Sequence, residues 1–101
     1  MGIACFQLNI FALTQMRNTK NRELMRKSDE RDMITTRLNK LISNNENWYK
    51  DPNVKLLQEH DNRLDNEQKT LDTALKDIEE KLANYEKQKE NNVKNGVPSL
   101  A

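Results

Sequence analysis

The longest regular pattern in this chain covers residues 54–92, which read VKLLQEHDNRLDNEQKTLDTALKDIEEKLANYEKQKENN. One row of apolar residues recurs at every seventh position: Leu57, Leu64, Leu71, Ile78 and Tyr85. A second row holds Val54, Leu75 and Leu82, and its polar positions are Asp61, Gln68 and Lys89. Spacings that alternate between three and four residues form a narrow apolar stripe on a helix, as in a coiled coil. The stretch therefore predicts one long helix that packs against another helix.

The composition indicates that the remainder of the chain is helical as well. Of 101 residues, 35% are hydrophobic and 33% are charged. The two Gly and two Pro residues all lie outside residues 3–51 and 53–95. Two uninterrupted runs rich in Lys, Glu, Asn and Leu favour long helices. We therefore predict an all-α fold, a long antiparallel two-helix coiled-coil hairpin with helices at about residues 3–42 and 52–94, forming a single domain over residues 1–101.

The first predicted helix carries its own stripe, which is apolar at both ends and basic in the middle. Arg17, Lys20, Lys27 and Arg31 occupy the central positions. On this helix the predicted contacts of the hairpin are Leu24, Ile34, Leu38 and Leu41. Residues 1–43 hold eight Lys or Arg against four Asp or Glu, whereas residues 44–101 hold nine against twelve. Opposite net charges of +4 and −3 favour pairing of the two helices with each other.

The start of the first helix is apolar on nearly every side. Its apolar residues are Ile3, Phe6, Leu8, Ile10, Phe11, Leu13 and Met16, and Cys5 and Ala12 lie among them. A helix that is apolar all round is normally buried all round, and one neighbouring helix cannot achieve this. We expect these seven residues to form an oligomerisation or docking surface, in a dimeric four-helix bundle or a higher assembly. The alternative is shallow insertion of residues 3–13 into a membrane surface.

A short polar connection predicts the turn at residues 43–51. Ser43, Asn44 and Asn45 compete for backbone hydrogen bonds and end helices. Asp51 suits the cap of the second helix, and Pro52 suits its first position, where no N–H is needed. We expect Trp48 and Tyr49 to plug the open end of the hairpin; the alternative is an exposed contact for a partner. Residues 96–101, which follow a Gly and contain Pro98, are expected to form a loose tail.

Closure at this turn predicts which residues face each other. Arg31 lies near Asp61 and Leu64, Lys27 lies near Gln68, and Leu24 lies near Leu71. Polar positions of one stripe thus meet polar positions of the other. Neither helix alone requires this agreement, so it supports the hairpin.

Catalytic, metal-binding and nucleic-acid-binding signals are weak. His60 is the only histidine and Cys5 the only cysteine, and they fall near opposite ends of the predicted hairpin, so no Cys–His dyad forms within one chain. Glycine occurs only near the termini, which excludes a Gly-rich phosphate loop. The basic residues 17–31 are interrupted by Glu23, Asp29 and Glu30, and the net charge is only +1. We predict no enzymatic activity, no cofactor, no metal and no nucleic-acid partner.

Two resemblances accompany these patterns. Two regions of the chain resemble small uncharacterised helical proteins of gut-associated bacteria. The first is the start of the chain, Met1-Gly2-Ile3-Ala4 with Gln7, Leu13-Thr14 and Arg17. The second is the acidic region from Leu64-Asp65 to Asn95. This resemblance implies a helical bacterial protein. The turn at residues 47–53 also looks like that of type III secretion needle subunits, although the duplicated proline motif of that turn is absent.

The predicted function follows from the architecture. We expect a non-enzymatic coiled-coil scaffold or protein–protein interaction module whose partner is a second copy of the same chain. The alternatives are a component of a secretion apparatus, as an exported hairpin subunit or a small chaperone, and a protein anchored to a membrane surface. The expected location is the cytoplasm, or outside it after export without a cleaved signal.

Overall fold

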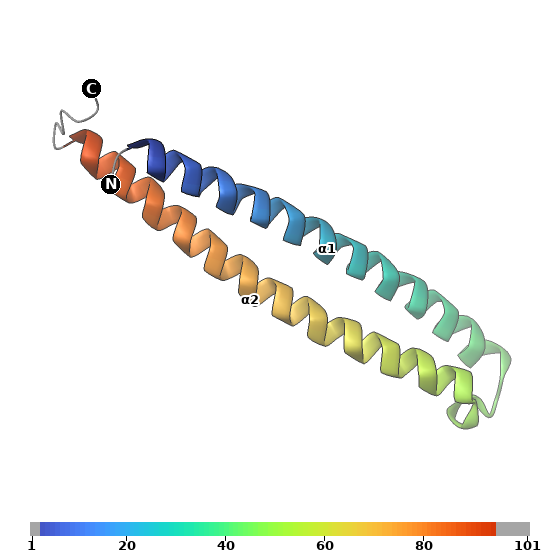
Figure 1. Cartoon of the computed structure of the whole chain (residues 1–101). Coiled ribbons are helices and arrows are strands. Elements are labelled where there is room, and N and C mark those ends of the chain that lie inside the picture. The colour runs from blue at the N-terminus through green and yellow to red at the C-terminus, as the bar shows by residue number, and fades with distance from the viewer. Residues whose placement is uncertain (1–2, 95–101) are drawn as a thin grey trace. The chain divides into compact units, whose positions relative to one another are not determined.

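The structure, a computed structural model, consists of two long helices joined by a short turn. It describes the backbone of residues 3–94, and the side chains of residue 5 and of residues 7–91. Helix α1 spans Ile3–Asn44, the 3-10 helix η1 spans Trp48–Lys50, and helix α2 spans Pro52–Lys94 (Figure 1). No strand occurs within residues 3–94. The predicted all-α helical hairpin is therefore confirmed, and α1 continues to Asn44, beyond its predicted end at residue 42. The expected tail at residues 96–101 lies outside the described residues.

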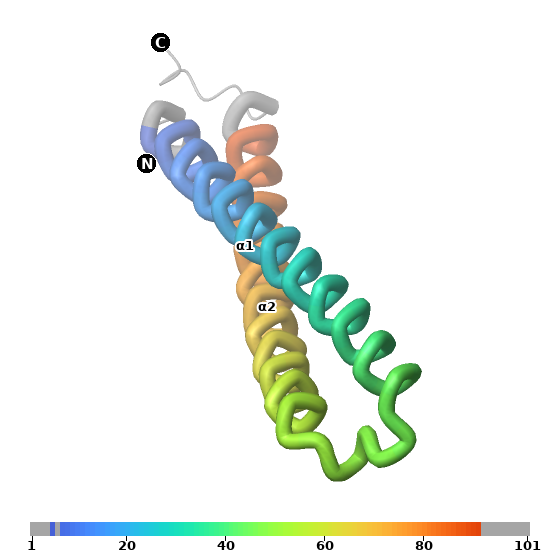
Figure 2. The backbone as a smooth tube through the Cα atoms, turned by 90° about the vertical axis from the view of Figure 1, so that its right-hand side faces the viewer, coloured from blue at the N-terminus to red at the C-terminus, as the bar shows by residue number. Residues whose placement is uncertain are grey.

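The chain forms two compact units. The turn unit is Arg22–Asp72, which contains the second half of α1, η1 and the first half of α2. The terminal unit combines residues 3–21 of α1 with residues 73–94 of α2. Both helices run through both units, and the backbone trace shows each of them as one continuous helix (Figure 2). That residues 1–101 act as a single domain stays a prediction.

In the turn unit, the buried residues come from the predicted apolar stripes. Ile34, Val54, Leu64 and Leu71 are between 2% and 7% exposed. Each leucine or isoleucine buried in this way stabilises the fold by about 1.5–3 kcal/mol. Four other stripe residues of this unit are half-buried: Leu24, Leu38, Leu41 and Leu57. Packing of the two stripes therefore holds the two helices of the turn unit together.

In the terminal unit, burial is concentrated on α2. Leu75, Ile78 and Leu82 are between 4% and 8% exposed. Tyr85 on α2, and Ile10 and Leu13 on α1, are half-buried. None of the described α1 side chains of this unit is fully buried. The start of α1 therefore retains accessible apolar surface in the hairpin.

Two backbone N–H groups at the turn and the start of α2 donate to side chains of the turn. The Asn47 N–H donates to Asn45 Oδ1 at 3.0 Å, and the Asn53 N–H donates to Asp51 Oδ1 at 2.8 Å. Asp51 has extended backbone angles, φ −71° and ψ 119°, which is the geometry of a helix N-cap. The N-cap predicted at Asp51 is therefore present, and Pro52 occupies the first position of α2.

The aromatic residues of the turn lie in η1 and contact each other. The rings of Trp48 and Tyr49 are 5.9 Å apart and nearly perpendicular, and Lys50 Nζ lies 5.7 Å from the centre of the Tyr49 ring. Trp48 is half-buried, whereas Tyr49 is 64% exposed. The expectation that both residues plug the hairpin is therefore wrong for Tyr49, because adjacent residues of a tight helical turn point in different directions.

Candidate interaction surfaces

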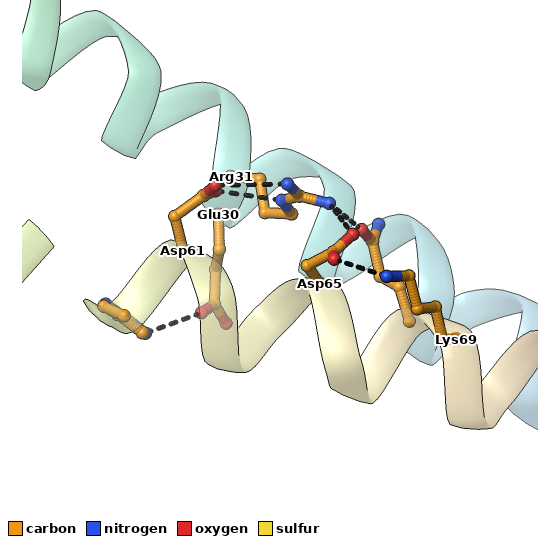
Figure 3. A network of polar contacts seen from close by, with 7 residues as sticks. Glu30, Arg31, Asp61, Asp65 and Lys69 are labelled. Atoms are coloured by element: carbon orange, nitrogen blue, oxygen red, sulfur yellow. Dashed lines mark hydrogen bonds and ion pairs between the residues drawn. The ribbon is translucent and has the colours of Figure 1, made fainter. Parts of the chain in front are cut away.

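A polar cluster joins α1 to α2 in the middle of the turn unit. The Arg31 Nε–H and Nη2–H groups donate to Asp61 Oδ1 and Oδ2 at 2.9 and 3.1 Å. The Nη1 group donates to Asp65 Oδ1 at 3.0 Å and to Gln68 Oε1 at 2.7 Å. Lys69 Nζ lies 3.0 Å from the other Asp65 oxygen (Figure 3). We call these five residues the Arg31 cluster, and they confirm the predicted contact between Arg31 and Asp61.

A second ion pair lies next to this cluster. Lys27 Nζ is 2.6 Å from Glu67 Oε2, and both side chains are partly exposed. The sequence pattern placed Gln68 opposite Lys27, but Gln68 instead accepts a hydrogen bond from Arg31. A lysine side chain is long enough to leave the stripe and reach an acid beside it. The pairing of the helices is thus as predicted, while the partner of Lys27 differs by one residue.

These contacts shift the pKa values of four groups. The hydrogen bond to Asp61 raises the pKa of Arg31, and the hydrogen bond to Glu67 raises the pKa of Lys27. The hydrogen bond from Lys69, followed by the charges of Lys69 and Arg31, lowers the pKa of Asp65. The hydrogen bond from Lys27 lowers the pKa of Glu67. Each of these four shifts favours the charged form of its group.

The hydrogen bonds of this cluster connect α1 and α2 in the turn unit. A guanidinium that holds a carboxylate with two parallel hydrogen bonds fixes both side chains in one geometry. Its acids are occupied by cations of the same chain, which leaves no free acid–base pair there. Within the described side chains, no group of three or more His, Cys, Asp or Glu residues is arranged to hold a metal. His60 lies 3.8 Å from Glu30, a contact that is an ion pair only when the imidazole is protonated.

Two ion pairs with a spacing of four residues lie along α2. Lys69 pairs with Asp65 at 3.0 Å, and Lys81 pairs with Asp77 at 3.1 Å. Such exposed pairs contribute only a few tenths of a kcal/mol each, roughly 0.3–0.5. Lys81 and Asp77 are both more than half exposed, so their pair lies on the solvated surface of α2.

The N-terminal apolar surface lies on the terminal unit. Leu8 is 68% exposed, Phe11 64% and Met16 48%, and the side chains of Cys5 and Ala12 are also exposed. Residues 5, 8, 12 and 16 are three or four positions apart, so they share one face of α1. Of the other residues predicted for this surface, Ile10 and Leu13 are half-buried, and the side chains of Ile3 and Phe6 lie outside the described ones. Among the described members, only Leu8, Phe11 and Met16 are exposed to solvent.

A groove near the turn, which we call the tip groove, was not expected from the sequence. It has a volume of about 490 Å³ and is lined by Arg37, Lys40, Leu41, Asn53, Leu56 and Leu57. Leu56 is 63% exposed, although Leu57 beside it belongs to the stripe. Adjacent residues of a helix do not share a face. The Leu56-Leu57 pair was the available signal, because one of two neighbouring leucines had to point away from α1.

The comparisons with known proteins supply no relative: no family model, curated protein or solved structure matches this chain. Neither α1 nor α2 contains, within residues 3–94, a stretch long and apolar enough to cross a membrane. Functional inference therefore depends on the surfaces described above.

Proposed function

We propose that this protein is a non-enzymatic helical interaction module that associates with a second copy of itself through the N-terminal apolar surface. The observation that supports this proposal is the exposure of Leu8 and Phe11, at 68% and 64%, on the same unit of the hairpin. Clustered apolar side chains of this size mark contact sites more often than isolated ones do. Leu75, Ile78 and Leu82 of α2 in the same unit are already buried, whereas Leu8, Phe11 and Met16 of α1 are exposed.

The chemistry of this surface fits a permanent protein contact. No charged residue occurs between Ile3 and Met16, and Arg17 is the first. The cores of protein interfaces are depleted of charged residues and enriched in aromatic residues and methionine. Phe11 and Met16 are of those types. A surface that is free of charge for four helical turns can be buried against an identical surface without leaving an unpaired ion.

A second copy is the partner that the symmetry of such a contact favours. Two copies related by a twofold axis bury the same surface twice, and this arrangement is the commonest in homo-oligomers. The two hairpins would then contribute four helices, and we propose that these pack as a coiled-coil bundle. Phe11 would be central in this contact, because it lies between Leu8 and Met16 along α1.

Sedimentation velocity over a range of protein concentrations tests the proposal. The wild-type protein is expected to sediment as a dimer or larger species. The double variant Leu8→Ser, Phe11→Ser is expected to sediment as a monomer with unchanged helix content by circular dichroism. The matched control is Met25→Ser, Met33→Ser, because Met25 and Met33 are 67% and 61% exposed on the turn unit. The proposal fails if the wild type is monomeric throughout, or if both double variants dissociate equally.

The apolar residues 3–13 also fit a membrane surface, and flotation with liposomes separates the two cases. A membrane anchor predicts that the wild type floats with vesicles and that the Leu8→Ser, Phe11→Ser variant does not. Self-association predicts that the wild-type protein stays at the bottom of the gradient. Binding to vesicles together with a monomeric wild type would replace the proposed function with the membrane alternative.

A further inference from the structure

We propose that the tip groove binds an acidic amphipathic helix of a partner protein, as a third helix laid along the two helices of the turn unit. This site is separate from the N-terminal apolar surface, because all residues that line it belong to Arg22–Asp72. The proposal therefore goes beyond self-association and gives the module a contact for a different protein.

The floor of the groove is apolar and continuous. Leu41 of α1 and Leu57 of α2 are half-buried at its base, and Leu56 projects from its edge. A neighbouring hollow of about 150 Å³ shares Arg37 and Leu57 with it and adds Met33 and Ile34. Hollows that share lining residues extend along the same side of the helix pair. Such a strip accepts the apolar face of a helix whose contact residues recur every three or four positions.

The rim of the groove is basic, and no acid among the described residues pairs with it. Arg37 and Lys40 line the groove, and neither forms an ion pair with any residue that the structure describes. Residues 37–57 contain four basic residues against two acidic ones. One of those acids, Asp51, caps α2. The unneutralised charge at this end of the turn unit is therefore positive.

The apolar floor and the basic rim of the tip groove together indicate an amphipathic helix with acidic residues as its partner. An apolar helix face would cover Leu41, Leu56 and Leu57, and acidic residues flanking that face would reach Arg37 and Lys40. Complementary charges at the edge of an interface select the partner and speed its association more than they add affinity. At the other end of the hollow, Glu30 adds an acidic side chain, 3.8 Å from His60. The acidic residues of the partner are therefore needed near the turn.

A charge-swap experiment tests this assignment. The probe is a fluorescently labelled synthetic amphipathic helix with leucines on one face and glutamates beside them. A second peptide has the same leucines and lysines in place of the glutamates. The wild-type protein is expected to bind the glutamate peptide at least about tenfold more tightly than the lysine peptide, as measured by fluorescence anisotropy. The double variant Arg37→Glu, Lys40→Glu is expected to reverse this preference.

Two further variants locate the binding site. Leu56→Ser is expected to weaken binding of the glutamate peptide by about tenfold or more, because it removes an exposed anchor without disturbing the buried stripe. Met25→Ser is the control, since Met25 is similarly exposed on the same unit but does not line the groove. Leu8→Ser, Phe11→Ser is expected to bind the peptide as the wild type does, which separates this site from the proposed self-association.

Three outcomes overturn the inference. The first is equal binding of the two peptides, or no binding of either. The second is unchanged binding by Leu56→Ser. The third is a wild-type oligomer that dissociates on Leu56→Ser and not on Leu8→Ser, Phe11→Ser, which would assign the tip groove to a second copy of this chain.

Discussion

Arg31 of α1 donates two parallel hydrogen bonds to Asp61 of α2, at 2.9 and 3.1 Å, between the two helices of the turn unit. The same guanidinium reaches Asp65 and Gln68, so one side chain connects three positions of the opposite helix. Apolar stripes that repeat every seven residues can also pack after one helix slides by a heptad. A slide of this kind would put Val54 or Gln68 where Asp61 now lies. The Arg31 cluster therefore selects one alignment of the two helices.

Replacement of Arg31 is expected to lower the melting temperature, and Arg31→Lys is expected to recover only part of the loss seen in Arg31→Ala. Lysine keeps the charge but cannot form the two parallel hydrogen bonds to Asp61. Thermal denaturation followed by circular dichroism measures the effect. A double-mutant cycle with Asp61→Asn is expected to be non-additive, whereas a cycle between Arg31→Ala and Lys81→Ala is expected to be additive. Equal melting temperatures for Arg31→Lys and the wild type would contradict the role of the two-bond geometry.

Stability is expected to fall at both extremes of pH. The folded-state pKa values of Asp65 and Glu67 lie below their ordinary values of 3.8 and 4.5, so the unfolded chain takes up protons first. The contribution of these two carboxylates to the free energy of unfolding is complete at pH values above their ordinary pKa values. It is lost as the pH falls through their lowered folded-state pKa values. The pKa of Lys27 is raised above 10.5, so its contribution is lost as the pH rises through that raised value.

Urea denaturation at a series of pH values checks this dependence. The variant Asp65→Asn, Glu67→Gln is expected to show a smaller loss of unfolding free energy below pH 4.5 than the wild type. The control, Asp77→Asn, removes an exposed acid of the terminal unit. It is expected to leave the loss of unfolding free energy at acid pH nearly unchanged. An identical loss of unfolding free energy at acid pH in the wild type and in both variants would contradict the pKa shifts.

Leu64 and Leu56 provide a matched test of the packing. Leu64 is 4% exposed and Leu56 is 63% exposed, and both lie on α2 of the turn unit. Leu64→Ala is expected to reduce the free energy of unfolding by about 2–5 kcal/mol. Leu56→Ala is expected to change it by less than about 0.5 kcal/mol, as for exposed positions in general. Urea denaturation of the two variants measures the difference, and comparable losses would show that the burial pattern is wrong.

The cap of α2 is expected to contribute measurably to stability. Asp51→Ala removes the acceptor of the Asn53 N–H and is expected to cost about 0.5–2 kcal/mol. Asp51→Asn retains a side-chain oxygen at the cap and is expected to lose far less. Urea denaturation of the two variants is the measurement. A loss of the same size in both variants would attribute the effect to the charge of Asp51 and not to the hydrogen bond.

Much of the fold was predictable because periodic burial is a local property of the sequence. Leu64, Leu71 and Ile78 repeat every seven residues, and all three are buried. The contact between Arg31 and Asp61 followed from the position of the turn, because the turn fixes which residues face each other. Asp51 and Pro52 marked the start of α2 without reference to any other part of the chain.

Other features depend on the rotation of each helix about its axis, which a stripe specifies only approximately. The sequence did not indicate that Lys27 would pair with Glu67 beside the stripe, and it left open whether Tyr49 would plug the hairpin or be exposed. It also did not indicate that Arg37 and Lys40 of α1 would line one groove with Leu56 of α2, because all three residues lie off the stripes. A surface to which both helices contribute can be identified only once the structure shows how the two helices are rotated.

The fixed alignment set by the Arg31 cluster also limits how the length of this chain can change in evolution. Loss of seven residues between Arg31 and the turn would preserve the stripe of α1 but bring Arg31 opposite a different heptad of α2. Loss of seven more residues between the turn and Asp61 would restore the original pairing. Homologues of different length are therefore expected to gain or lose heptads in pairs, one in each helix, at equal distances from the turn.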